Sequence, residues 1–240
     1  MLENINPQSN QPVLGMRRRA QNNFLYLLGG LLFLFMLVPT LRLFSWGAVE
    51  VDLLRSLLLV AFSLFTIISV WSLHREQKIF RVGLALSVLN IGSAVTMLFF
   101  PTWAIEMVSA VLIIVFSVLS CYIAGRHVFG LQATDGNSLI GAVCVYLLLG
   151  LIWALVYDML SFIWPTGSFQ GLTIQGNSFQ FDNFLYFSFV TLTTAGYGDI
   201  TPLNPMVRTL AYMEMITGQF YMAILVSGLV AHFMGQRMSK

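Results

Sequence analysis

The chain has 240 residues, of which 58% are hydrophobic and only 9% are charged, and its mean hydropathy is +0.81. Soluble domains usually carry about a quarter charged residues, so a water-soluble fold this apolar would lack the polar side chains that cover a surface. The composition therefore excludes an ordinary soluble protein and indicates an integral membrane protein. The formal net charge is +2, and no basic run is long enough to suggest a nucleic-acid partner.

The chain divides into a polar start and a series of apolar stretches. Residues 1–23 are rich in Asn, Gln and Pro and are predicted to form a cytoplasmic tail. A membrane-spanning helix needs about 20 apolar residues, and six later stretches meet or approach that length. In chain order, the predicted spans are Phe24–Phe44, Val51–Leu73, Val82–Phe100, Trp103–Gly125, Leu139–Trp164 and Met206–Met234. The expected fold class is therefore an all-α membrane protein.

The placement of positive charges orients these predicted helices. With the amino terminus inside, nine of the 12 Lys and Arg residues fall in cytoplasmic segments. This distribution agrees with the positive-inside tendency and with an even number of spans. We therefore expect a multi-pass protein with both termini cytoplasmic.

The first four predicted helices carry little charge. Residues 24–126 are expected to form a four-helix peripheral module, and residues 127–138 a cytoplasmic linker. A voltage sensor needs several arginines on one helix that crosses the field. The fourth predicted span, Trp103–Gly125, contains no Lys or Arg. The sequence thus predicts weak or absent voltage dependence in this module.

The segment between the fifth and sixth predicted spans differs from the rest. Thr166–Phe181 is a polar outer loop, and Asp182 is expected to cap a short helix over Asn183–Thr193. That helix would be about 17 Å long, which is too short to cross a bilayer. A Gly-rich loop follows, and Pro202 and Pro205 suit the start of the last helix. Because irregular backbone at membrane depth is tolerated where it lines a water-filled path, this re-entrant element indicates a pore.

The Gly-rich loop reads Thr193-Thr194-Ala195-Gly196-Tyr197-Gly198-Asp199. It resembles the potassium-channel signature, TTVGYGD in its commonest form, with Ala195 where valine usually stands. The aromatic short helix, the signature and the following helix also occur in the family's order. The resemblance implies a six-transmembrane-type bacterial potassium channel, in which residues 139–240 form the pore module of a homotetramer. It also implies a prokaryotic plasma (inner) membrane as the location.

The same resemblance implies roles for individual residues. The backbone carbonyls of Thr194, Ala195, Gly196 and Tyr197 would bind K⁺ in place of its hydration shell, and the Thr194 hydroxyl would form the innermost ring. Gly196 and Gly198 tolerate the positive φ that such a strand needs. Ala195 is smaller than valine, so a weakly selective cation channel of the same architecture is the alternative.

Further residues are expected to support this filter. They are Thr193, Gly198, Asp199 and Tyr186. In many relatives a tryptophan of the short helix bonds to the aspartate behind the filter. Tyr186 stands at the matching position here, and its hydroxyl can serve instead.

The last predicted span is expected to line an inner vestibule. Gly218 follows Tyr197 at the distance of the family's hinge glycine, and a close helix contact is the alternative reading. The side chains that follow it at helical spacing are Gln219, Met222, Val226 and Val230. Glu214 is an ionisable group at membrane depth, for which we expect a structural hydrogen bond.

Partners and chemistry follow from this interpretation. We expect membrane lipid, three further copies of the chain, and a separate regulatory protein or ligand as partners. K⁺ is the permeant ion and no cofactor is expected. An intramembrane enzyme or a transporter is the alternative of another class. The three histidines, His74, His127 and His232, lie near predicted helix ends, and one re-entrant element is found where a transporter would normally show a repeat. The expectation is therefore a protein that is not an enzyme.

Overall fold

The computed structural model describes residues 23–44, 51–72, 77–100, 102–128, 136–164, 167–172 and 180–238. These residues are mostly helical, and each predicted span coincides with a helix. The helices are α2 (Asn23–Phe44), α3 (Val51–Ser72), α4 (Gln77–Phe99), α5 (Trp103–Val128), α6 (Gly136–Ile163), α7 (Phe181–Leu192) and α8 (Pro205–Met238). Two short strands complete the described elements, β1 (Phe169–Gln170) and β2 (Thr201–Pro202).

Length and apolar composition indicate which described helices can cross a membrane. Among the described residues, three stretches are long and apolar enough to cross a membrane: Phe80–Met97 in α4, Ala104–Arg126 in α5 and Ser138–Ile163 in α6. Shorter apolar stretches lie in α2 (Phe24–Leu37) and α3 (Leu59–Ser69). In lipid, a helix satisfies every backbone hydrogen bond internally, which explains why these apolar sequences are helical. The protein is therefore a membrane protein.

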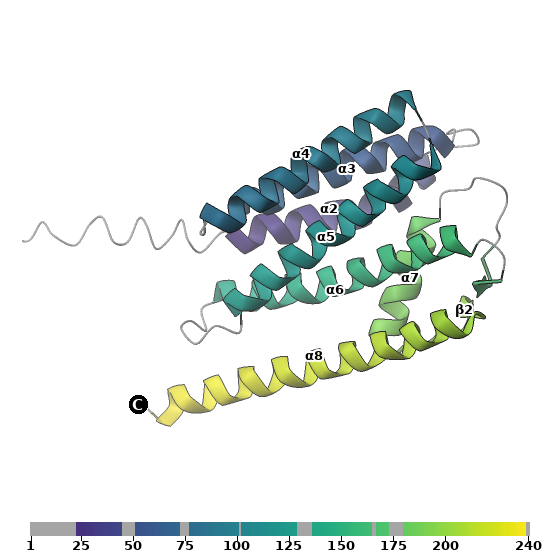
Figure 1. The fold of residues 1–240 in the computed structure, drawn as a ribbon. Helices are drawn as coiled ribbons and strands as arrows, with labels where there is room; N and C mark the ends of the chain where they lie inside the picture. Colours follow the sequence, from purple (N-terminus) through teal and green to yellow (C-terminus); the bar gives the residue numbers. More distant parts are fainter. Residues whose placement is uncertain are drawn as a thin grey trace, which may run out of the picture.

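The helices are arranged in two groups (Figure 1). Helices α2 to α5 pack beside one another, and α6 lies against α2 and α5. Short α7 fills the space between α6 and α8, near the end of α6 and the start of α8. One apolar core runs through both groups, from Phe24 in α2 to Tyr221 in α8. Ser69 and Ser120 hydrogen-bond inside the first group at 3.1 Å and tie α3 to α5.

The starts of α7 and α8 correct two expectations about helix capping. The prediction that Asp182 caps α7 is wrong, because α7 begins at Phe181 with Gln180 at the cap position. Asp182 lies instead in the first helical turn, where a negative charge interacts favourably with the helix dipole.

Helix α8 begins at Pro205, as its fixed φ favours. Its cap is Asn204, whose Oδ1 accepts the Met206 N–H at 2.8 Å. Pro202, which we expected to open this helix, lies in β2.

Candidate functional site

Helix α7 is held by aromatic side chains on one side. Phe184 and Phe187 are buried in the core, and the Phe187 ring lies 5.1 Å from the ring of Tyr157 on α6, edge to face. A Cβ at Gly150 of α6 would lie 2.6 Å from the Phe189 ring, so only glycine permits this approach. The sequence NFLYFSFVTL thus forms a short helix fixed against α6 by its phenylalanines.

The signature loop turns back on the end of α7. The N–H groups of Thr193, Thr194 and Ala195 donate to α7 carbonyls at 3.0, 2.9 and 2.9 Å, and Gly196 N–H donates to Val190 O at 3.3 Å. These bonds occupy four successive N–H groups of the loop. The orientation of its first peptide planes is therefore set by α7.

Backbone dihedrals in the loop alternate. Thr194, Gly196 and Gly198 have φ of 59°, 55° and 81°. Gly196 and Gly198 thus adopt the positive φ for which glycine was expected. Thr194 is the one non-glycine residue of the described part of the chain with a positive φ. A β-branched residue rarely adopts this conformation, and such strain concentrates at functional sites.

The outer end of the loop carries the expected tyrosine–aspartate contact. Tyr186 Oη donates to Asp199 Oδ2 at 2.8 Å, and Asp199 Oδ1 accepts the Ile200 N–H at 3.0 Å. The Tyr186 and Tyr197 rings stack at 6.4 Å with 15° between their planes. The hydrogen bond that was expected between Tyr186 and Asp199 is therefore present.

The inner end of the loop meets α8. Gln219 Nε2 donates to Thr194 Oγ1 at 3.2 Å. Gly218 is buried, and a Cβ there would overlap the Leu192 carbonyl oxygen of α7. The structure therefore shows the close helix contact that was one interpretation of Gly218. Its role as a hinge stays a prediction.

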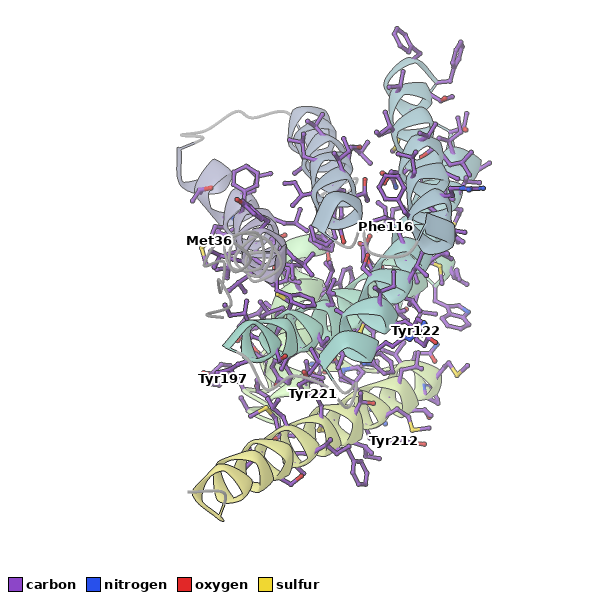
Figure 2. The ribbon with its side chains drawn as sticks, turned by 90° about the vertical axis from the view of Figure 1, so that its left-hand side faces the viewer. Met36, Phe116, Tyr122, Tyr197, Tyr212 and Tyr221 are labelled. Atoms are coloured by element: carbon purple, nitrogen blue, oxygen red, sulfur yellow. The ribbon has the colours of Figure 1, made fainter. Side chains whose placement is uncertain are left out.

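Helix α8 has two different faces. The buried face follows helical spacing and packs toward α6 and α7; its members are Val207, Ala211, Glu214, Gly218 and Tyr221. Figure 2 shows Tyr221 on this side and Tyr212 projecting from the opposite side. The expected vestibule residues Gln219, Met222 and Val226 are exposed, and the side chain of Val230 lies outside the described residues.

Sequence reasoning missed the contribution of the outer loop. Strand β1 pairs antiparallel with β2, which begins two residues after Asp199, the last residue of the signature. Phe169 lies opposite Pro202 and Gln170 opposite Thr201. Phe169 is 7% exposed, and its ring lies 5.2 Å from Phe184 and 5.3 Å from Phe187. The local signal for this anchor was Phe169 itself, an apolar side chain in a mostly polar stretch. The loop therefore connects the signature's outer end to the aromatic cluster around α7.

Metal binding would need a cluster of His, Cys, Asp or Glu side chains, and a disulfide would need two neighbouring cysteines. Within the described part of the chain, no group of three or more His, Cys, Asp or Glu could hold a metal ion. His74 and the side chains of His127 and His232 lie outside that part. Cys121 and Cys144 are free, and Cys144 is buried in the core. The cysteines thus occupy the positions of small apolar side chains.

Comparisons with known proteins bear on α6 to α8. Residues 142–234 match the family model for an ion channel, a range that includes the short helix and the signature loop. Two pore potassium channel c of Oryza sativa subsp. japonica is 44% identical over 48 residues, which are 20% of this chain and 10% of that protein. Two-pore potassium channel 5 of Arabidopsis thaliana is 46% identical over 46 residues, or 19% of this chain and 11% of that protein. The match thus spans about a tenth of the length of these relatives, and no solved structure matches the chain.

Proposed function

We propose, from the ion-channel domain of the potassium-channel family that residues 142–234 carry, that four copies of this chain form a pore for passive, selective K⁺ permeation. The observation that carries the proposal is the backbone of the signature loop, with its positive φ at residues 194, 196 and 198. Alternation of this kind lets successive carbonyls face the same side of an extended strand. The carbonyls of Thr194, Ala195, Gly196 and Tyr197 are the proposed K⁺ ligands.

The physical requirement is desolvation at small net cost. A K⁺ ion that enters a narrow passage exchanges its water for other oxygens, and rings of backbone carbonyls supply them. One chain supplies one part of each ring, so the proposal requires several copies around an axis. The exposed apolar side chains of α8 support this, because Met213 is 50% exposed and Phe220 is 65% exposed in the single chain. Large exposed apolar surfaces mark contacts with partners or lipid.

At the inner end, we propose that Gln219 orients the Thr194 hydroxyl. An ion on Thr194 Oγ1 needs a lone pair, so the hydroxyl proton must point elsewhere. A rotated Gln219 amide would present its oxygen as the acceptor for that proton, at the place where its Nε2 now donates. Gln219 would thus donate to the Thr194 hydroxyl when no ion is bound and accept its proton when an ion is bound.

Ala195 favours a second candidate, a weakly selective cation channel. Its carbonyl is equivalent to that of valine, but its side chain fills less space behind the loop. We expect K⁺ selectivity over Na⁺ to survive and filter stability in low K⁺ to decline. Reversal potentials of the wild type and Ala195→Val in mixed ions test this. A poorly selective wild type would favour the second candidate.

The proposed membrane topology has six spans, α2 to α6 and α8, with α7 re-entrant and both termini cytoplasmic. Residues 24–126 are the proposed peripheral module, 127–138 the linker and 139–240 the pore module. In α5, Glu106 lies in the first turn and Arg126 near the carboxyl end, with no basic residue between them. This charge distribution supports opening that depends weakly on voltage. A steep conductance–voltage curve would contradict it.

Ion flux in liposomes tests the proposed function. Purified protein is expected to pass K⁺ down its gradient with little Na⁺ flux, and Gly196→Asp is expected to abolish the flux. Gly167→Asp is the matched control, because Gly167 also has a positive φ (81°) and an added Cβ there meets open space. Equal K⁺ and Na⁺ flux, or flux that persists in Gly196→Asp, would overturn the proposal.

A further inference from the structure

A buried polar cluster lies where α6, α7 and α8 meet. Its members are Glu214 on α8, Ser188 on α7 and Tyr157 on α6, and all three are 0% exposed. Tyr157 Oη donates to Glu214 Oε2 at 2.7 Å. Ser188 Oγ lies 2.5 Å from Glu214 Oε1 and 2.7 Å from the Gly150 carbonyl oxygen of α6.

Counting protons in this cluster distinguishes two forms of Glu214. Ser188 has one hydroxyl proton but stands at hydrogen-bond distance from two oxygens. If Glu214 were ionised, its Oε1 and the Gly150 carbonyl oxygen would both be acceptors. Ser188 could donate to one of them, and its contact with the other would bring two lone pairs together without a proton between them. If Glu214 carries a proton on Oε1, it donates to Ser188, and Ser188 donates to Gly150. Tyr157 then donates to Oε2, and every close oxygen pair contains one proton.

The surroundings agree with the neutral form. Within the described part of the chain, the polar partners of Glu214 are Tyr157 and Ser188, and neither provides a positive charge. Tyr146 of α6 is a further titratable side chain that interacts electrostatically with Glu214, and it too is uncharged or negative. An ionised carboxylate buried without a cation is costly.

We propose that Glu214 is a protonated acid that donates through Ser188 to Gly150, and that this relay positions α7 between α6 and α8. The proposal deepens the proposed channel function and rests on it for its consequence. Ser188 directly precedes the α7 residues Phe189, Val190 and Thr191, whose carbonyls hold the signature loop. Glu214 is therefore a positioning residue that acts on the filter through α7.

Infrared spectroscopy of the purified protein tests the protonation state directly. A protonated acid has a carbonyl stretching band that a carboxylate lacks. The difference between wild type and Glu214→Gln at neutral pH is expected to contain this band. In Tyr157→Phe the band is expected at higher frequency, because the acid's carbonyl oxygen loses its donor. A difference spectrum with carboxylate bands in its place would overturn the proposal.

Flux and thermal unfolding test the positioning role. Glu214→Gln keeps a donor toward Ser188 and an acceptor for Tyr157, so it should retain K⁺ flux and the wild-type melting temperature. Glu214→Leu has similar size but no polar group, and it should lose flux and melt several degrees lower. Equal behaviour of the two variants, or failure of Glu214→Gln to fold, would overturn the relay. A folded wild type that shows the acid band but passes no K⁺ would refute the channel proposal alone.

Discussion

Replacement of Gly218 by alanine is the most direct perturbation of the contact between α8 and the base of the signature loop. The new Cβ would overlap the carbonyl oxygen of Leu192, the last residue of α7. This obstacle is backbone, and Leu192 is fully buried, so it cannot rotate away as a side-chain end could. Helix α8 must therefore move outward, and with it the neighbouring Gln219 that bonds to Thr194.

Two opposing free energies set the expected magnitude. An alanine in place of glycine stabilises an unobstructed helix interior by about 1 kcal/mol, whereas overpacking a tight contact costs about 1–3 kcal/mol. Because the obstacle at Gly218 is backbone, the overpacking cost of Gly218→Ala lies near the upper end of its range, at about 3 kcal/mol. After the helix gain of about 1 kcal/mol is subtracted, the free energy of unfolding falls by about 2 kcal/mol. For a chain of this size, that corresponds to a melting temperature lower by about 4–8 °C.

Thermal unfolding in detergent measures this effect, with Gly92→Ala as the matched control. Gly92 lies inside α4, and an added Cβ there meets nothing within 4 Å, so the control should gain stability. Gly218→Ala should also reduce K⁺ flux in liposomes. If both variants were stabilised equally and both conducted normally, the close contact at Gly218 would have no energetic importance.

Three further substitutions test other contacts. Phe169→Ala removes the buried ring that anchors the outer loop. Chemical denaturation should show a free energy of unfolding lower by about 3–5 kcal/mol. A loss below about 1 kcal/mol would show that this ring does not anchor the loop. Tyr221→Phe removes the hydroxyl that donates to the Ala142 carbonyl of α6 at 2.5 Å. Chemical denaturation should show a free energy of unfolding lower by about 1 kcal/mol. An unchanged free energy of unfolding would show that the bond contributes nothing to stability. Tyr186→Phe removes the exposed hydrogen bond to Asp199, so the free energy of unfolding should change by less than about 0.5 kcal/mol. K⁺ flux through this variant should decay faster than wild-type flux after exposure to low K⁺. If the two fluxes survive this exposure equally well, the bond does not stabilise the filter.

The helices were predictable from the sequence because lipid leaves the backbone few alternatives. An apolar stretch in a bilayer must satisfy its own N–H and C=O groups, so hydropathy alone locates the helix. The predicted starts at Val51 and Trp103 coincide with those of α3 and α5. The boundaries that moved, such as the start of α4 at Gln77, lie in polar sequence, where hydropathy carries no information.

The contacts around the signature were only partly predictable. The bond between Tyr186 and Asp199 could be predicted because the motif fixes both positions relative to the loop. The pairing of β1 with β2 joins residues about 30 positions apart, and a two-residue strand has no periodicity that a pattern could detect. The positive φ of Thr194 was likewise hidden, because a threonine gives no sign of a left-handed conformation.

Gly171 shows how far the constraints on this loop extend along the chain. Its φ is 88°, and a Cβ there would overlap the carbonyl oxygen of Asp199. Any other residue at position 171 would therefore press on the last residue of the signature from outside the motif. A mutational scan should therefore find position 171 as intolerant of substitution as the two glycines of the signature, although it lies more than 20 residues before the motif.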